Sequence, residues 1–341
     1  MRLLIIGGTK FLGRHLAAMA LEAGHEVALL HRGRTGAELF PAARHLLADR
    51  DDTAAMQAVL AGAGPWDAVI DTSAYVPRQV RTLAGMLAGR TRHYQLVSTI
   101  SVYVDAPRDT TPEEAALRTL ADETIEEVSG QTYGALKALC ERAARQGFAG
   151  TGTAVLVGRP GLIVGPFDPT ERFTWWVRRF ARAAAGEPVL VPGDPAAPVQ
   201  FIDARDLAAW MLAQATAGTP GTFNLTGPAQ RLTMGACLEA MRGALGAGAR
   251  LTWAPQAFLL QQGVTPWTEL PLWVPDDDAG MMRIDIGRAL RAGLALRPLP
   301  QTLLDTWAWA RENPPAAPGA TGIDPEREVA LLRLADATPS P

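Results

Sequence analysis

The chain has 341 residues, of which 48% are hydrophobic and 20% charged, with a formal net charge of −3. This composition is that of a globular protein and excludes disordered and fibrous classes, while the length favours two lobes over one core. The charge balance provides no basic field, so no nucleic-acid partner is expected. No apolar run reaches the roughly 18 to 20 residues of a membrane span, and the apolar start is too short for a signal-peptide core. We therefore expect a cytoplasmic protein without a membrane partner.

Apolar runs alternate with helical stretches through the first half of the chain. Strands are predicted at residues 3–6, 26–30, 45–47, 68–71, 94–99 and 154–157, and helices at residues 11–23, 56–61 and 80–88. Strands separated by helices of this length indicate right-handed βαβ units. The predicted fold class is α/β, with a doubly wound parallel sheet.

The second half is richer in Pro, Gly and Trp and predicts a smaller C-terminal lobe interwoven with late sheet elements. We expect a division at residues 1–165, 166–312 and 313–341. The last part would combine a flexible Pro/Ala/Gly-rich linker at 313–321 with an amphipathic helix at 323–335. The two cysteines, Cys140 and Cys237, match neither a disulfide framework nor a metal-ligand pattern, so no metal site is expected. Cys140 is predicted to be a small buried hydrophobic residue.

A glycine-rich run lies between the first predicted strand and the first predicted helix. Gly7 suits the tight turn, Gly13 lets the helix approach the sheet, and the helix N-terminus presents free N–H groups to a pyrophosphate. This placement predicts a dinucleotide site on a Rossmann-type sheet. Lys10 replaces the middle glycine, and we expect its ammonium to contact a phosphate. The expected contacts from the rest of the run are Thr9, Phe11 and Leu12.

The second strand ends in arginines rather than in an acidic residue. An acid would repel a 2′-phosphate, whereas Arg32 and Arg34 could bind it through bidentate hydrogen bonds. NADP(H) is therefore predicted in preference to NAD(H), which remains the alternative if these arginines are only solvated. Asp49, after the third strand, would contact the adenine amino group or cap a helix. Further cofactor contacts are expected from Arg50, Ser73 and Pro160.

Only two of the 32 basic residues are lysines, Lys10 and Lys137. A position that stays lysine in such a chain indicates a need for a compact ammonium with rotatable donors. Lys137 follows Tyr133 by four residues, which places both on one helical face. A phenol with a pKa of about 10 is a poor proton-transfer group near neutrality, and a neighbouring ammonium lowers that pKa. Lys137 could also hold the nicotinamide ribose.

Hydroxyl groups gather where the fifth strand ends. Ser98, Thr99, Ser101 and Tyr103 lie where parallel strands leave a ligand crevice. Each alone would more often bond within a loop, but together with Tyr133 and Lys137 they indicate a site that orients a substrate oxygen.

These motifs resemble the extended and atypical branches of the short-chain dehydrogenase/reductase superfamily, in particular the NAD-dependent epimerase/dehydratase family. The resemblance covers most of residues 1–310. It rests on the glycine run, Ser98-Thr99 through Val102-Tyr103, Tyr133 and Lys137, Arg159-Pro160 through Gly165-Pro166, Phe201-Ile202-Asp203 with Asp206-Leu207, and Phe223-Asn224. It implies that Thr99, with Ser98 as its neighbour, is the catalytic hydroxyl. It also implies a homodimer formed by paired helices, one of which carries Tyr133.

Two positions argue against a nucleotide-sugar substrate. Leu162 and Val199 stand where the resemblance would place an asparagine and a phosphate-binding arginine. Without them a diphosphate would be poorly paired. Two ring-rich segments, one with Arg172 and Trp175 and the other from Trp267 to Trp273, favour an apolar or aromatic carbonyl compound if they line the cleft, although such segments also form cores.

The resulting prediction is an oxidoreductase that transfers hydride between nicotinamide and a carbonyl or alcohol carbon of a small molecule. One alternative is a nucleotide-sugar epimerase or dehydratase with retained NAD. The other is a non-catalytic, cofactor-sensing or RNA-associated binding protein.

Overall fold

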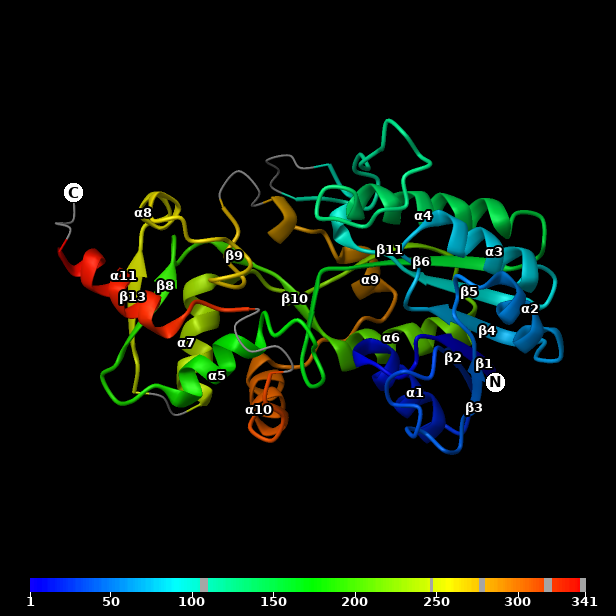
Figure 1. Cartoon of the computed structure of the whole chain (residues 1–341), viewed down its shortest axis with the longest axis horizontal. Helices are drawn as coiled ribbons and strands as arrows, with labels where there is room; N and C mark the ends of the chain where they lie inside the picture. The colour runs from blue at the N-terminus through cyan, green and yellow to red at the C-terminus, as the bar shows by residue number, and fades with distance from the viewer. Residues whose placement is uncertain (105–109, 246–247, 276–279, 316–320, 338–341) are drawn as a thin grey trace.

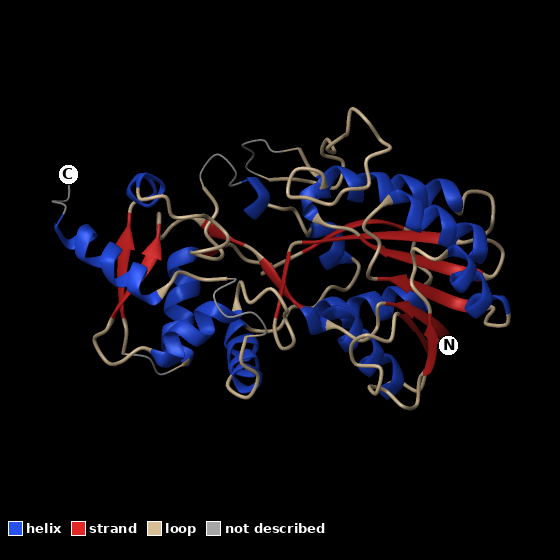
Figure 2. Ribbon diagram, in the orientation of Figure 1, coloured by secondary structure: helices blue, strands red, loops and turns tan. Residues whose placement is uncertain are grey.

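The computed structural model describes residues 1–104, 110–245, 248–275, 280–315 and 321–337. The chain forms two lobes, one built on a central sheet and one on helices with short strand pairs (Figures 1 and 2). The elements of the sheet lobe are β1 Arg2–Ile6, α1 Phe11–Glu22, β2 Glu26–His31, β3 Arg44–Leu47, α2 Thr53–Ala61, β4 Trp66–Asp71, α3 Pro77–Leu87, β5 Thr91–Val97, the 3₁₀ turn η1 Ile100–Val102, α4 Tyr133–Gly147, β6 Ala154–Pro160, α6 Ala204–Ala217, β11 Gly221–Leu225 and α9 Gly287–Arg291.

The smaller lobe is built from β7 Leu162–Val164, α5 Thr174–Arg182, β8 Pro188–Pro192, β9 Pro198–Val199, β10 Phe201–Asp203, β12 Leu232–Thr233, α7 Met234–Ala244, β13 Arg250–Ala254, α8 Gln256–Gln261, α10 Leu299–Ala310 and α11 Pro325–Ala337. Its strands pair two by two, as β10 with β7, β12 with β9 and β13 with β8. None of the helices in the described ranges has the length and apolar character needed to cross a bilayer.

The central sheet has seven parallel strands in the order β11-β6-β5-β4-β1-β2-β3. The predicted doubly wound parallel sheet is therefore confirmed. The strand order reverses between β1 and β4, and at such a point the helices leave a crevice outside the carboxyl ends of the strands.

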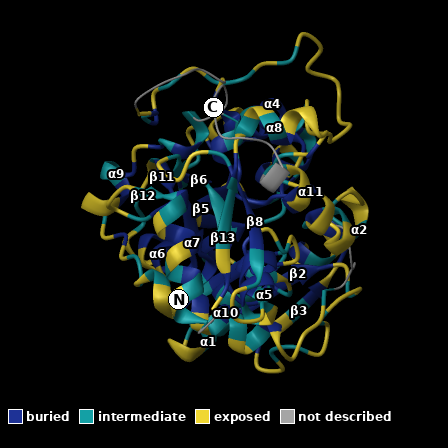
Figure 3. Ribbon diagram, turned by 90° about the vertical axis from the view of Figure 1, so that its left-hand side faces the viewer, coloured by how far each residue is buried: buried dark blue, intermediate teal, exposed yellow. Residues whose placement is uncertain are grey.

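Both faces of the sheet are covered, so its strands are almost continuously apolar. In β1, Leu3 and Ile5 pack with the face that carries α1 and α6, while Leu4 and Ile6 pack with α2, α3 and α4. Figure 3 shows the buried strands inside a shell of exposed helix surfaces and loops. Cys140 is fully buried in the second of these clusters, as predicted.

Two predicted boundaries differ from the structure in an informative way. The strand expected at 94–99 is β5, which ends at Val97, so the hydroxyl-bearing residues after it belong to a turn. The predicted terminal helix exists as α11, and Leu331 and Leu332 pack it onto the core of the small lobe. Of the linker predicted at 313–321, residues 316–320 lie outside the described residues.

Candidate active site

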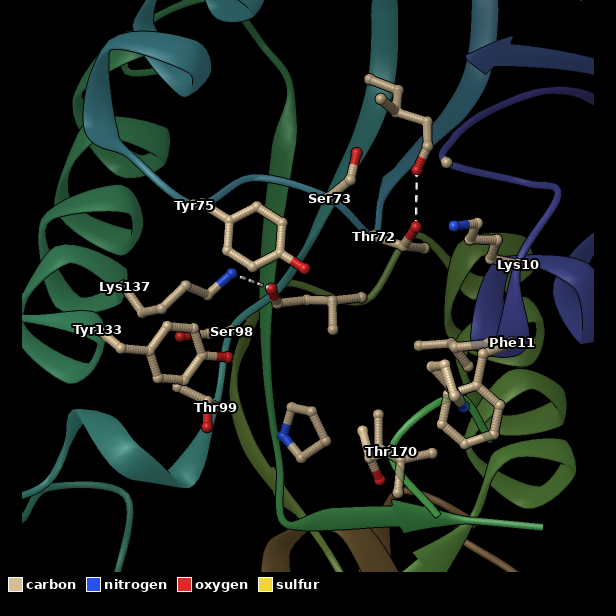
Figure 4. A pocket seen from close by; sticks show the side chains of 18 of the residues that line it. Lys10, Phe11, Thr72, Ser73, Tyr75, Ser98, Thr99, Tyr133, Lys137 and Thr170 are labelled. Atoms are coloured by element: carbon tan, nitrogen blue, oxygen red, sulfur yellow. Dashed lines mark hydrogen bonds between the residues drawn. The ribbon is translucent and has the colours of Figure 1, made fainter. Parts of the chain in front are cut away.

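A cleft of about 1050 Å³ opens along the carboxyl ends of the parallel strands and continues onto the small lobe. It is lined by the glycine-rich turn at one side, by the start of α4 at the other, and by segments of the small lobe (Figure 4). Most of the residues predicted from the sequence to bind cofactor or substrate line this one cleft.

The glycine-rich turn has the geometry that a dinucleotide needs. Gly7 has φ +88°, and a Cβ there would lie 2.6 Å from Thr72 Oγ1. A Cβ on Gly13 would lie 2.2 Å from the Gly7 carbonyl oxygen, so only glycine allows α1 to start this close to the sheet. Lys10 precedes α1 and makes no capping bond with its side chain. The N-terminal N–H groups of α1 thus face a cradle that fits a pyrophosphate. The other lining residues of this turn are Thr9, Phe11 and Leu12.

Arg32 and Arg34 line the cleft as exposed side chains on the loop after β2. The base of this loop is fixed by two histidines. Gly33 donates its N–H to His31 Nδ1 at 3.1 Å, and His31 Nε2 lies 2.8 Å from His45 Nδ1. Since His31 Nδ1 accepts, the proton of that ring is on Nε2 and is donated to His45. Burial lowers the pKa of His31 and favours this neutral form.

The floor near the expected adenosine contains a buried ion pair. The two terminal nitrogens of Arg50 donate to the Asp71 carboxylate at 2.9 and 3.0 Å, and one also reaches Ser73 Oγ at 3.1 Å. Burial opposes ionisation of Asp71, but the charge of Arg50 outweighs it and lowers the pKa of Asp71. Arg50 and Ser73 thus line the cleft with the two terminal nitrogens of Arg50 and the Ser73 hydroxyl already paired, whereas Arg50 Nε has no hydrogen-bond partner among the described residues. Asp49 also lines the cleft, and the cap of α2 is Asp52, so the capping role considered for Asp49 is wrong.

Lys137 is buried beneath the reacting end of the cleft, with a relative exposure of 4%. Its ammonium donates to the carbonyl oxygens of Ala74 and Val97, both at 2.6 Å, and lies 5.8 Å from the centroid of the Tyr75 ring. Burial lowers its pKa. Two of the three ammonium donors are thereby committed to backbone, which fixes the group and leaves one N–H for a ligand hydroxyl.

Tyr133 is the first residue of α4 and faces Thr99, which follows β5 (Figure 4). Burial raises the pKa of Tyr133, and a hydrogen bond with the Thr99 side chain acts in the opposite direction. Thr99 Oγ1 also accepts from the Ser101 N–H at 3.1 Å and lies 3.2 Å from Ser101 Oγ. A Cβ on Gly134 would lie 2.0 Å from the Ser101 carbonyl oxygen, so glycine at this position allows α4 to approach η1.

Two of the predicted site hydroxyls belong to a buried network instead. Ser98 Oγ donates to Glu141 at 2.7 Å, and Arg159 donates to the same carboxylate at 2.6 and 2.8 Å. The Tyr103 hydroxyl donates to Asn224 Oδ1 at 2.6 Å and accepts from Arg159 at 2.9 Å. The Tyr103 hydroxyl is therefore already satisfied within the protein. The residue lines a smaller cavity together with Ser101 and Tyr133, and the substrate role expected for it stays a prediction. Ser98 lines the cleft, but its hydroxyl is bonded to Glu141, and Thr99 is the hydroxyl that faces Tyr133.

The small lobe contributes part of the predicted substrate set. Leu162 and Arg172 line the cleft from the small lobe, while Ser101 and Pro160 line it from the sheet lobe. Trp175 does not line it: it is 9% exposed and packs in the core of the small lobe, 4.7 Å from the ring of Trp176. Its predicted contact with substrate is wrong, because the start of α5 turns this ring inward. The aromatic residue that lines the cleft is Trp267.

Several lining residues were not predicted from the sequence. They include Thr72, Tyr75, Gln79, Thr170, Gln200, Met281 and Met282. Tyr75 could have been found, because it follows the strand that ends at Asp71 and thus lies at the carboxyl edge of the sheet. Gln200 and the two methionines gave no local signal, since only the packing of the two lobes brings them to the cleft.

The fold and the cleft together define a dinucleotide-binding enzyme of the short-chain dehydrogenase/reductase superfamily. Residues 3–226 match the model of the NAD dependent epimerase/dehydratase family. The chain belongs to that family, as the sequence motifs predicted. Among curated proteins, no sequence match reaches significance.

Solved structures with the same fold include UDP-sugar 4-epimerases and a further enzyme in complex with NAD⁺. The UDP-Glc/GlcNAc 4-epimerase of Campylobacter jejuni has a TM-score of 0.69 at 16% identity, over 91% of this chain and 99% of that one. The UDP-glucuronic acid 4-epimerase of Bacillus cereus, in complex with NAD, has a TM-score of 0.67 at 15% identity, over 93% and 99%. The Bordetella bronchiseptica enzyme WbmH, in complex with NAD⁺, has a TM-score of 0.67 at 16% identity, over 92% and 98%. At these identities the similarity shows the fold.

Proposed function

We propose that this enzyme transfers hydride between NADP(H) and a carbonyl or alcohol carbon of a small molecule. The proposal rests on one observation: Tyr133, Thr99 and Lys137 lie together in the cleft that also contains the glycine-rich turn. Three elements distant in sequence bring a proton donor, a hydroxyl and an ammonium to one place, and this is the set that carbonyl reduction requires.

Each group has a separate task in the proposed reaction. The nicotinamide, when bound, supplies the hydride donor or acceptor. Tyr133 Oη gives a proton to the substrate oxygen or takes one from it, and the Thr99 hydroxyl orients that oxygen. Lys137 holds the ribose with its remaining N–H. Because burial raises the pKa of Tyr133, the phenol is protonated near neutrality and ready to donate, which is the form needed for reduction.

The preference for NADP(H) is part of the proposal and rests on Arg32 and Arg34. Both are exposed in the cleft beside the histidine-braced turn, where a 2′-phosphate would meet two guanidinium groups. The test is the ratio of NADPH to NADH affinity in wild type and in Arg32→Ala. We expect the ratio to fall at least tenfold in the variant. An unchanged ratio would refute the role of Arg32.

A second candidate, an epimerase or dehydratase that retains NAD, is favoured by the family and by the structural neighbours. Against a nucleotide-sugar substrate stand Leu162, which lines the cleft as an apolar side chain, and Val199, which is fully buried. Mass analysis of nucleotide released by acid denaturation separates the two candidates. Near-stoichiometric NAD would establish the second candidate. A site that is empty on purification, takes up NADPH more tightly than NADH, and oxidises NADPH with carbonyl compounds would establish the first.

The expected homodimer is also a proposal. The segment before α4 crosses the outer face of α3 and α4, where Arg78 binds Glu126 at 2.9 Å and Arg142 contacts Glu123. Pairing through these helices would have to include this segment. Light scattering after gel filtration measures the mass directly, and a monomer of 36.3 kDa would refute the dimer.

A further inference from the structure

The reacting end of the cleft contains one positive side chain that the proposed reaction does not use. Among the described residues that line the cleft, the charged ones at the nucleotide side are Lys10, Arg32, Arg34, Asp49, Arg50 and Asp51. On the substrate side they are Lys137, whose donors are largely committed to backbone, and Arg172. Within the described ranges no carboxylate forms an ion pair with Arg172.

We infer that Arg172, supported by Trp267, is the binding site for a carboxylate of the substrate. The substrate class is then a carbonyl or hydroxy compound that carries one carboxylate on an otherwise apolar body. This inference rests on the proposed function, since it assigns the substrate of the same site.

The first support is the pairing of Arg172 with an aromatic ring. Its guanidinium carbon lies 5.7 Å from the centroid of the Trp267 ring, within the range of a cation–π contact. Stacking holds the planar guanidinium while its N–H groups remain available, and a guanidinium binds a carboxylate through two parallel bonds. Arg172 is also close enough to Tyr133 for its charge to oppose the effect of burial on that phenol. The anion site and the proton donor therefore share the same end of the cleft.

The second support is the unusual backbone conformation at or next to Arg172 and Trp267. Glu171, next to Arg172, has φ +57°, and Trp267 has φ +62°. Non-glycine residues rarely take this left-handed conformation, and where they do the surrounding structure must hold it. In the first segment, Asp168 Oδ1 accepts both the N–H and the hydroxyl of Thr170 at 2.8 Å. This turn holds the backbone that precedes Arg172, whose side chain lines the cleft.

The third support is a pair of residues from the C-terminal part of the chain, Thr321 and Gly322, which we call the strap. The strap connects the segment of Arg172 with the loop of Trp267. Thr321 Oγ1 donates to the Thr170 carbonyl at 2.9 Å, and the Gly322 N–H donates to the Thr268 carbonyl at 2.7 Å. Gly322 has φ +96° and packs so closely on Trp175 that a Cβ would lie 1.7 Å from its indole nitrogen. The strap continues into α11, where Glu328 binds Arg179 at 2.9 Å. The C-terminal segment thereby fixes the Arg172 segment relative to the Trp267 loop.

The surroundings favour one carboxylate over a diphosphate. On the substrate side the cleft is lined by the apolar Leu162, Met281, Met282 and Trp267, and by Thr170 and Gln200, whose side-chain polar atoms are bonded to Asp168 and to the backbone of Ile284. One guanidinium neutralises one negative charge, whereas the further charges of a diphosphate would be desolvated against apolar side chains without a partner. A single carboxylate on an apolar or aromatic body satisfies both features.

The test compares two ligands of similar shape and different charge, benzoate and benzamide, by calorimetry on the full-length protein saturated with NADP⁺. We expect benzoate to bind wild type at least tenfold more tightly than benzamide, as charge-assisted bidentate bonds allow. Arg172→Gln is expected to reduce that ratio to about one. Arg182→Gln is the matched control, because it makes the same change at an exposed arginine at the end of α5 outside the cleft. Thr321→Val removes only the strap hydrogen bond and should lower the ratio several-fold.

Three results would overturn the inference: equal binding of the two ligands to wild type, a preference that survives Arg172→Gln, or loss of the preference in Arg182→Gln. Inorganic pyrophosphate and UDP are tested separately in the same assay. If either binds more tightly than benzoate and this binding depends on Arg172, the site is assigned to a diphosphate and the carboxylate is rejected. The readout involves no hydride transfer. If the anion preference holds while no carbonyl compound oxidises NADPH, the proposed function fails and the anion site stands.

Discussion

The buried carboxylate of Asp168, in the segment just before Arg172, predicts how the free energy of unfolding depends on pH. Asp168 is 1% exposed, one carboxylate oxygen holds Thr170, and among the described residues the other has no hydrogen-bond partner. Burial raises the pKa of Asp168 from 3.8 to about 6. Since the folded state binds the proton more tightly than the unfolded chain, ionisation of Asp168 destabilises the folded state. This cost begins near the unfolded pKa of 3.8, grows as the pH rises to about 6 and is nearly complete above that pH.

The magnitude follows from the two pKa values. The full cost at high pH is about 3 kcal/mol, and about 1.4 kcal/mol of it develops between pH 5 and pH 8. Asp168→Asn removes this titration while its amide oxygen can still accept from Thr170. The amide N–H₂ then replaces the unpartnered oxygen, but that penalty does not depend on pH. We therefore expect the free energy of unfolding of the variant relative to wild type to rise by about 1.4 kcal/mol from pH 5 to pH 8.

The assay is urea unfolding followed by fluorescence of the nine tryptophans at pH 5, 6, 7 and 8. Asp194→Asn is the matched control, because the exposed Asp194 also accepts a backbone N–H two residues ahead, at 2.8 Å. The control should show no such trend. A difference between Asp168→Asn and wild type that stays constant across this range would refute the reasoning.

The remaining predictions concern the catalytic end. Gly134→Ala should push α4 away from η1 and lower kcat about a hundredfold with a small change in KM, because displacing Tyr133 by about 1 Å has effects of that size. An unchanged kcat, measured once a substrate is found, would contradict the role of this close contact. Gly13→Ala should weaken NADPH binding by more than tenfold in a fluorescence titration while the protein stays folded by circular dichroism, because its Cβ would meet backbone. Glu141→Gln should lower the free energy of unfolding by about 3 kcal/mol or more, because it leaves the buried charge of Arg159 unpaired; equal midpoints in urea would contradict this.

The parts of the site that were predictable are those encoded by local spacing. The glycine-rich run between a strand and a helix located the dinucleotide turn, and the i,i+4 spacing of Tyr133 and Lys137 placed both on α4. The same spacing continues to Glu141, which could have been recognised as a third member of this helical face. Its partner Arg159 could not, because nothing in the sequence shows that β6 lies under α4.

The errors arose where side-chain direction depends on packing. Ser98 and Thr99 are neighbours that both line the cleft, but the Ser98 hydroxyl is bonded to Glu141, whereas the Thr99 hydroxyl faces Tyr133. The sequence does not show that a carboxylate lies where it binds Ser98. Trp175 and Trp267 present the same difficulty, since both occur in ring-rich segments. The phase of α5 and the left-handed backbone at Trp267 decide which ring reaches the cleft, and both depend on the tertiary structure.

The structure explains why this arginine-rich chain has a lysine at position 137. Its ammonium donates to two carbonyl oxygens from different segments, Ala74 after β4 and Val97 at the end of β5, each at 2.6 Å. Lys137 is 4% exposed, and a guanidinium is larger than an ammonium and directs its donors in one plane. An arginine in this buried position would not bind the same two carbonyls and still present an N–H to the cleft. A chain that otherwise uses arginine therefore keeps lysine here because the position needs rotatable donors in a small volume, in addition to positive charge. The same argument does not apply to Lys10, which is exposed and makes no capping bond, so its retention is consistent with a contact to a ligand phosphate.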